Sequence, residues 1–312
     1  MKCKVALVCG VLLVLTGALL VLTGALLVLT GALLVLTGAL TLHTPRTSHG
    51  AEDMSDHTLD YFVGLGLIKR EDAADVTWAH AVNSRSKVSQ ALHDSTLMLE
   101  ADVLMRAPEP KEPVMAHPPQ TDSDITLGAW LQALKTTHKG IKLDFKSLDA
   151  VAPSMELLEQ TLGRSSRPVW LNADVLPGPG GVASPLDPHL FLLAAGARPA
   201  DTVLSLGWTT GWTHGAENPG YSWEMVREME QICRSLKNPV TFPVRGALIG
   251  QSEAQLLWLL QQSPRYSLTV WTGQSDTLKT DDLLRLRKRL EPQRVYYDLP
   301  DEHRVRLAQT DP

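Results

Sequence analysis

The residues best suited to chemistry in this sequence are acidic and basic groups that recur two positions apart within short apolar runs. Glu100 and Asp102 lie in the run LMLEADV, and Asp144 lies between Lys142 and Lys146 in GIKLDFK. Residues two apart in an extended strand point to the same face, so these groups would share a surface. Carboxylates gathered on one surface repel one another unless a cation binds, and hard oxygen ligands favour Mg²⁺ or Ca²⁺. We therefore predict that Glu100, Asp102 and Asp144 bind one such ion.

Two histidines accompany these acidic runs. His80 ends the run DVTWAH, and His117 follows the first acidic run in PVMAHPP. Beside a bound cation, one histidine can act as nucleophile or base and the other as acid, while Lys146 neutralises a phosphate oxygen. This combination suits phosphoester chemistry, in which positioning and charge stabilisation supply most of the rate. Singly, a histidine more often makes a structural hydrogen bond, and Lys142 or Lys146 can simply pair with Asp144, but ionisable groups on consecutive strands favour a site.

Further polar and aromatic residues in or near the predicted strands are candidates for substrate binding. They are Asn83, Lys142, Asn172, Trp208, Arg245 and Trp271. Asp174 lies two residues after Asn172 and therefore on the same face. The tryptophans are equally consistent with the core, and Arg245 is equally consistent with a pair to a carboxylate. The sequence has no GxSxG elbow, HExxH helix or Walker loop, which argues against hydrolases of those classes and against NTPases.

The elements that must position these groups are eight short apolar runs rich in Val, Leu, Trp or Tyr, as buried parallel strands are. They cover residues 75–80, 97–103, 140–146, 168–175, 202–208, 239–245, 266–272 and 294–299. Helical patterns lie at 84–94, 126–136, 153–163, 222–236, 252–263 and 280–290, and several begin with Ser, Thr or Asp, as helix N-caps do. Strands alternating with helices predict parallel pairing, and eight such units predict a closed α/β barrel, the (β/α)8 TIM type. A doubly wound open sheet is the alternative, disfavoured because no glycine-rich phosphate loop follows the first strand; residues 178–181 predict a turn.

Length and composition fit a single domain of this kind. Of the 312 residues, roughly 260 follow the apolar N-terminus, which is typical of one barrel. The chain is 44% hydrophobic and 20% charged, a globular composition. Its net charge of −5 and its lack of long basic runs argue against nucleic acid as a partner. Of three cysteines only Cys233 lies in the globular part, so we predict no disulfide framework and expect this residue in the core.

Residues 1–43 form an apolar segment. Lys2 and Lys4 precede an uncharged stretch from 5 to 42 that contains four near-exact VLTGALL heptads. Such a segment predicts a spanning anchor or, second, a cleaved signal, so that the barrel would be secreted or would lie outside a single-pass anchor. A third interpretation is a gene-model artefact, because exact repetition is typical of recent duplication of a short coding unit. Residues 44–56 are expected to be a linker, 57–305 the barrel and 306–312 a tail.

Nine segments in matching order resemble the menorin family, also called family with sequence similarity 151. They are WAHAVNS, LEADVLM, MAHPPQTDSD, GIKLDFKSL, WLNADVLPGP, LSLGWTTGW, GYSWEMVREME, VTFPVR and YSLTVWTG. The segments GWTTGW and GYSWEMVREME are most similar to the shorter, B-type branch of the family. The resemblance spans residues 57–300, and the heptad-rich N-terminus is a departure from it.

The resemblance implies kinship with phospholipase-C-like barrels of the glycerophosphodiester phosphodiesterase and phospholipase-D-toxin type. Carried over by motif, it implies catalytic histidines at His80 and His117, a phosphate-contacting lysine at Lys146, and the same three carboxylates as metal ligands. The implied substrate is a glycerophosphodiester or phospholipid headgroup, and the family is linked to neuronal and photoreceptor upkeep. Those enzymes usually carry Arg-Gly after the first histidine, where this chain has Ala-Val-Asn at 81–83. The alternative function is a non-catalytic extracellular or membrane-tethered protein that binds a cell-surface protein partner and uses the barrel as a scaffold.

Overall fold

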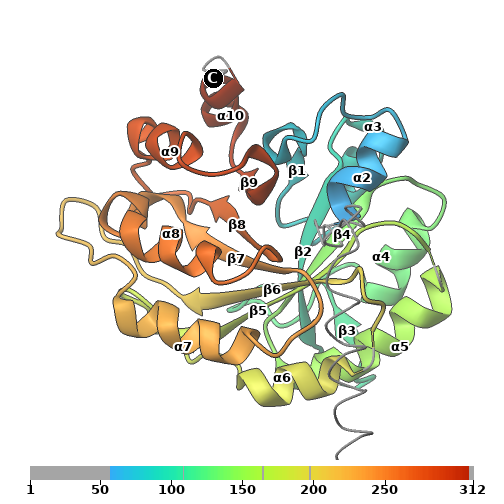
Figure 1. Cartoon of the computed structure of the whole chain (residues 1–312). Helices are drawn as coiled ribbons and strands as arrows, with labels where there is room; N and C mark the ends of the chain where they lie inside the picture. The colour runs from blue at the N-terminus through green and yellow to red at the C-terminus, as the bar shows by residue number, and fades with distance from the viewer. Residues whose placement is uncertain (1–56, 108, 164, 197, 309–312) are drawn as a thin grey trace, which may run out of the picture. The chain divides into compact units, whose positions relative to one another are not determined.

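The computed structural model describes residues 57–308 apart from 108, 164 and 197, so the apolar segment 1–43 and the linker 44–56 lie outside the described residues. Eight parallel strands follow one another in chain order around the barrel (Figure 1). They are β1 (Trp78–Ala79), β2 (Met98–Met105), β4 (Gly140–Phe145), β5 (Val169–Pro177), β6 (Val203–Thr209), β7 (Val240–Arg245), β8 (Tyr266–Trp271) and β9 (Val295–Asp298). Each strand predicted from the sequence is confirmed, and so is the TIM-type barrel.

Helices alternate with the strands and form the outer layer (Figure 1). They are α2 (His57–Gly64), α3 (Arg85–His93), α4 (Leu127–Leu134), α5 (Val151–Leu162), α6 (Pro188–Ala195), α7 (Trp223–Cys233), α8 (Glu253–Gln261), α9 (Thr280–Arg287) and α10 (Asp301–Ala308). The side chains of Ser84, Thr126 and Ser222 accept hydrogen bonds from the first turns of α3, α4 and α7, as N-caps do. Within residues 57–308, each helix is too short or too polar to span a bilayer.

Because side chains alternate between the two faces of each strand, two separate apolar clusters form, one outside the barrel and one inside it. Outward-facing residues such as Leu99, Ile141 and Leu206 pack against the helices and form the main core, which also holds the buried Cys233 as expected. Inward-facing Trp78, Met98, Trp170 and Tyr296 form a second cluster, which we call the aromatic plug. Its rings pack edge to face, with centroids 4.9 Å apart for Trp170 and Tyr296 and 5.2 Å apart for Trp78 and Trp170. The plug fills the N-terminal end of the barrel, so polar inward-facing residues are left for the other end.

Side chains close the barrel between its first and last strands. The ladder of parallel pairs runs from β1 to β9, and β1 and β9 are neighbours without a ladder between them among the described residues. The rings of Trp78 and Tyr296 lie 6.5 Å apart across this seam. Above them, His80 Nδ1 lies 2.8 Å from Asp298 Oδ2. The seam therefore brings together two residues that are 218 positions apart in the chain.

The glycine-rich segment at 178–181 follows β5 and forms a turn, as the sequence predicts. The backbone N–H of Gly181 donates to the carbonyl of Gly178 at 3.2 Å. Gly180 has a φ of +64° and lies against the backbone of Gly211, where a Cβ would come within 3.2 Å of the carbonyl oxygen. Both the left-handed backbone and the close approach require glycine there.

Candidate active site at the barrel mouth

Glu100, Asp102 and Asp144 converge at the carboxyl ends of β2 and β4. The strand register pairs Asp102 directly with Asp144, and Glu100 lies two residues earlier on the same face. One carboxylate oxygen from each residue lies within 4.8 Å of the others. Burial, reinforced by the charge of Asp102 and opposed by His80, raises the pKa of Glu100 to about 7. A buried, mutually repelling set of hard oxygen donors fits a Mg²⁺ or Ca²⁺ ion, and the predicted ligand set is thus assembled in one place.

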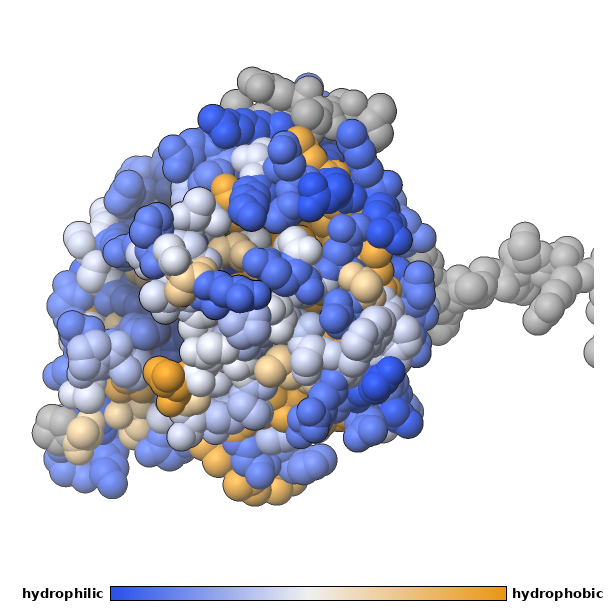
Figure 2. All heavy atoms as spheres, turned by 90° about the vertical axis from the view of Figure 1, so that its left-hand side faces the viewer, coloured by the Kyte–Doolittle hydropathy of each residue, from blue (hydrophilic) through white to orange (hydrophobic). Residues whose placement is uncertain are grey.

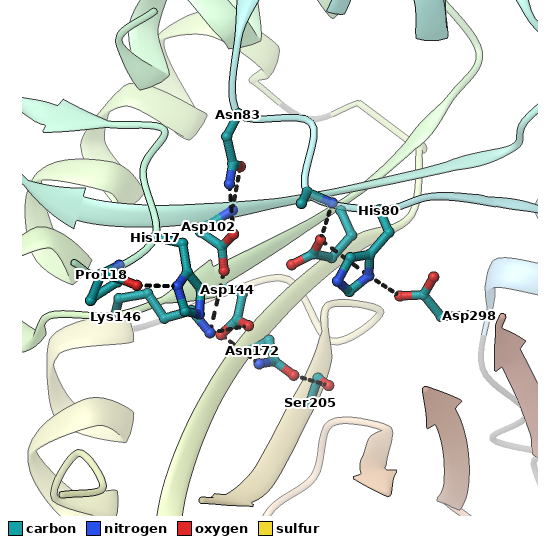
Figure 3. A network of polar contacts seen from close by, with 12 residues as sticks. His80, Asn83, Asp102, His117, Pro118, Asp144, Lys146, Asn172, Ser205 and Asp298 are labelled. Atoms are coloured by element: carbon teal, nitrogen blue, oxygen red, sulfur yellow. Dashed lines mark hydrogen bonds and ion pairs between the residues drawn. The ribbon is translucent and has the colours of Figure 1, made fainter. Parts of the chain in front are cut away.

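Hydrogen bonds fix the orientation of these three carboxylates (Figure 3). The backbone N–H of Ala81 donates to Glu100 Oε2 at 2.7 Å. Asn83 donates from Nδ2 to Asp102 Oδ2 at 2.7 Å and accepts from the Asp102 backbone N–H at 2.9 Å. Asn83 was predicted to bind substrate, but both ends of its amide are occupied by Asp102, so it serves to hold that carboxylate.

Asn172 does for Asp144 what Asn83 does for Asp102. Its Nδ2 donates to Asp144 Oδ1 at 2.7 Å, and its Oδ1 accepts from the Ser205 hydroxyl at 2.5 Å. A chain of hydrogen bonds therefore crosses β4, β5 and β6 at one level of the barrel (Figure 3). The structure places this candidate substrate-binding residue in a supporting position, because its amide is engaged on both sides.

The two lysines of the third predicted strand lie at different depths. Lys146 Nζ lies 2.6 Å from Asp144 Oδ2 and 3.3 Å from Asp102 Oδ1. Burial opposes its charge, but these carboxylates outweigh burial and raise the pKa of Lys146 above its ordinary value. Lys142 is only 4% exposed, and its Nζ lies 5.8 Å from the centroid of the Trp78 ring. Lys142 thus lies under the carboxylates and against the aromatic plug. This position differs from the predicted one, which was at the mouth among the substrate-binding residues.

His80 stands beside Glu100 with one ring nitrogen engaged. Its Nδ1 lies 2.8 Å from Asp298 Oδ2 and 3.5 Å from Glu100 Oε2. The charge of Glu100 above all, with that of Asp298 and against the effect of burial, raises the pKa of His80 to about 10. The side chain is 54% exposed, and its Nε2 makes no hydrogen bond to the part of the chain that the structure describes. A histidine fixed through one nitrogen and open at the other is arranged for proton transfer or attack.

His117 reaches the mouth by a different route. The short strand β3 (Pro113–Val114) pairs antiparallel with the end of β2 and turns the chain back toward the barrel. His117 is exposed, and its Nδ1 lies 2.6 Å from the carbonyl oxygen of Pro118. In the view of Figure 3 it lies on the same side of the carboxylates as Lys146. Among the described residues no hydrogen bond or ion pair joins it to the carboxylates.

Two carboxylates of this site were missed when roles were assigned from the sequence. Asp298 is 6% exposed and orients His80. Its place at the end of the eighth predicted strand is the sequence feature that could have indicated this role. Asp174 lies on the face of Asn172 and was noted there without a role. Its carboxylate makes no hydrogen bond or ion pair within residues 57–308, and burial together with the charge of Asp144 raises its pKa to about 7. Gly207 leaves room for it, since a Cβ at that position would lie 2.5 Å from Asp174 Oδ1.

Among the described residues, no hydrogen bond or ion pair joins the three remaining candidates to Glu100, Asp102 or Asp144. Trp208 is 1% exposed and packs in the main core against Tyr221 and Phe242, at 5.0 and 6.1 Å between centroids, so the core interpretation holds for it. Arg245 makes a bidentate ion pair with Asp276 at 2.7 and 2.6 Å. Pairing with a carboxylate was one of the two interpretations that the sequence left open for this residue. Trp271 stacks under the Arg245 guanidinium, 5.3 Å from its ring centroid.

Fold and site together define an eight-stranded parallel β/α barrel with a carboxylate–histidine cluster at the carboxyl ends of its strands. The family model of the Menorin N-terminal domain matches residues 72–304. Human "Protein FAM151B" is 48% identical over 263 residues, which cover 83% of this chain and 95% of that protein. The chain belongs to the menorin family, as its motifs indicated. A crystal structure of a GH18 chitinase from Pseudoalteromonas aurantia covers 71% of this chain and 78% of its own at 10% identity, and with a TM-score of 0.30 it carries no argument.

Proposed function

We propose that the barrel mouth is a divalent-cation-dependent phosphodiesterase-type site that acts on a glycerophosphodiester or phospholipid headgroup. The observation that carries the proposal is the meeting of three ligand carboxylates within 4.8 Å beside a histidine held by Asp298. An ion at these carboxylates, Mg²⁺ or Ca²⁺, would supply charge stabilisation for the phosphoryl oxygens. The protein would act at the cell surface or outside the cell, in line with the apolar N-terminal segment.

In this proposal the protein's own residues divide the work of proton transfer and orientation. Asp298 holds Nδ1 of His80. An ion bound at Glu100 would offset the carboxylate charge that keeps the His80 ring protonated, so that Nε2 could attack phosphorus or accept a proton. His117, exposed on the far side of the carboxylates, protonates the leaving oxygen. Lys146 pairs with Asp102 and Asp144, favours the ionised form of Asp144, and offers positive charge to a phosphate oxygen. Asn83 and Asn172 keep the carboxylates oriented, which is a positioning role.

The test is hydrolysis of bis(p-nitrophenyl) phosphate and of a glycerophosphodiester by the purified protein. Turnover should require Mg²⁺ or Ca²⁺, and His80→Ala and His117→Ala should each abolish it. Arg234→Ala, at the exposed C-cap of α7, is the matched control and should retain full activity. Turnover that persists in chelator, or in both histidine variants, would contradict the proposal.

The second candidate function is a non-catalytic extracellular or membrane-tethered binding protein with a cell-surface protein partner. Two observations favour it: the Ala-Val-Asn sequence at 81–83 in place of Arg-Gly, and the internal pairing of Lys146 with two of the three carboxylates. Affinity capture from cell surfaces with the wild type, Glu100→Ala and Asp144→Ala separates the candidates. A partner that all three proteins bind equally, without any hydrolysis by the wild type, would favour this second function.

A further inference from the structure

A cavity of about 300 Å³ lies outside the barrel, at the end opposite to the active-site candidate. It is enclosed by the C-terminal half of α5, the first residue of β5 and the loop between α6 and β6. Leu158, Leu162 and Val169 give it apolar walls, and Arg198 lies among them. A groove of about 400 Å³ adjoins it between α5 and α6 and shares Met155 and Glu159 with it. Small residues of the two helices line it together with the stems of Glu156, Glu159 and Gln160.

Arg198 is the unusual member of this cavity because one of its guanidinium donors is buried without an acceptor among the described residues. Its Nη1 donates to the carbonyl of Gly196 at 2.9 Å, but its Nε is buried and has no acceptor among the described residues. Burial lowers the pKa of Arg198, and no carboxylate acts against that effect. Glu159 and Asp201 line the same cavity but are exposed, and neither is within ion-pair distance of Arg198 in the described structure.

Two other arginines, the buried Arg167 and the half-buried Arg294, have their guanidinium donors satisfied by backbone carbonyls. Arg167, in the wall of the same cavity, donates to the carbonyls of Leu134, Lys135 and Thr137 at 2.8 to 3.0 Å. Arg294 donates from Nε and Nη2 to the carbonyls of Leu260, Ser263 and Tyr266 at 2.6 to 2.9 Å. An unsatisfied buried donor costs about 1–3 kcal/mol, more when charged, so the buried Nε of Arg198 would gain from an acceptor supplied from outside.

We propose that this cavity is a second binding site, which holds the anionic head of a single-chain amphiphile on Arg198 and its apolar chain along the groove between α5 and α6. A long-chain carboxylate fits both parts: two oxygens for the guanidinium fork and methylenes for the apolar walls. On the outer side of α6, Leu190 and Leu193 are 50% and 75% exposed and extend the apolar surface. Figure 2 shows apolar residues gathered at the lower edge of an otherwise hydrophilic face, at the height where Figure 1 places α6.

The direct test is calorimetric titration of the purified protein with dodecanoate, with dodecanol and dodecyltrimethylammonium as matched probes of the same chain length. Dodecanoate should bind at least about tenfold more tightly than either, because only it presents an anion to Arg198. Arg198→Met should lose at least about tenfold in affinity for dodecanoate, and Arg198→Lys should lose less. Arg234→Met, which replaces the exposed C-cap arginine of α7, is the control and should bind like the wild type. Equal binding of the three probes, or wild-type affinity in Arg198→Met, would overturn the proposal.

A second variant tests the cavity without touching the charge. Leu162→Trp places a large ring in the apolar wall and should weaken dodecanoate binding, while thermal unfolding shows whether the fold is kept. Asp144→Asn, in the barrel mouth, should leave dodecanoate affinity unchanged, so the two sites succeed or fail separately. A folded Leu162→Trp protein that binds dodecanoate like the wild type would count against the cavity as the site.

Discussion

The two ends of the barrel interior are built from the same strands in opposite ways. At the N-terminal end, Trp78, Met98, Trp170 and Tyr296 fill the space with apolar atoms and edge-to-face rings. At the carboxyl end, the next inward positions carry ionisable groups, which we call the charged layer: Glu100, Asp102, Asp144, Asp174 and Asp298 with His80, Lys142 and Lys146. The first end is held by packing, whereas the second depends on pairing and leaves five carboxylates facing three cationic groups. Apolar packing is therefore concentrated at one end of the barrel axis and ionisable groups at the other.

Lys142 marks the boundary between the two ends. Its stem passes from the charged layer into the plug, where its Nζ lies 5.8 Å from the centroid of the Trp78 ring. Its positive charge lowers the pKa of Asp144 and opposes the raised pKa of Glu100. A lysine in this place favours the ionised forms of Glu100 and Asp144 without occupying the mouth.

The largest expected effect is on stability, from the plug. Trp170→Ala should lower the free energy of unfolding by about 3–5 kcal/mol, because the ring is fully buried between Trp78 and Tyr296. Urea denaturation measures this loss. Mg²⁺ affinity, measured under conditions where the variant is folded, should stay within about threefold of the wild type. An unchanged stability with lost ion binding would reverse the proposed division of the barrel.

The next effect is on ion binding, from the charged layer. Asp144→Asn should weaken Mg²⁺ binding at least about 100-fold, or about 2.7 kcal/mol, because it removes a ligand charge. The stability of the ion-free protein should change little, because the substitution removes a repelling charge along with the pair to Lys146. Calorimetric titration measures the affinity. Asp149→Asn, an exposed acid after β4, is the control, and equal losses in both variants would refute a specific ion site.

A smaller effect is expected on the titration of His80. In the ion-free protein its folded pKa of about 10 lies above the ordinary 6.5, so its stabilising contribution is complete below pH 6.5 and is lost as the pH rises through about 10. Asp298→Asn should lower the pKa of His80 by at least about one unit, leaving the larger influence of Glu100. NMR titration of the imidazole measures both values. A pKa that is unmoved by Asp298→Asn would show that the seam contact does not control this histidine, while added Mg²⁺ should lower the pKa in either protein.

The smallest effect concerns the backbone beside His80. Ala81 has a φ of +51°, in the left-handed region, while its N–H holds Glu100. Ala81→Gly should raise the free energy of unfolding by about 0.5–1 kcal/mol, because glycine adopts this conformation without strain. Ala129→Gly, in the helix α4, is the control and should lower it by about 1 kcal/mol. Thermal unfolding of the two variants compares them, and a loss in Ala81→Gly as large as in the control would show that no strain is stored there.

Local sequence patterns were enough to predict much of this protein. Runs of apolar residues predicted all eight strands. The spacing of two positions predicted that Glu100 and Asp102 share one face of their strand. It predicted the same for Lys142, Asp144 and Lys146 on the next strand. The motifs also indicated the family. These features are local, because strand alternation depends only on neighbouring residues and holds wherever the strand lies.

The positions of the site side chains around and along the barrel depend on the tertiary structure and could not be predicted from local sequence. Strand alternation could not say that Lys142 ends against Trp78 while Lys146 reaches the mouth, or that Asp298 meets His80 across the seam. It also left open whether Trp208 and Arg245 face a ligand. In the structure, Trp208 packs in the core and Arg245 pairs with Asp276. The physical reason is that the closure and stagger of a barrel are set by all strands together, so the neighbours of a side chain depend on segments far away in the sequence.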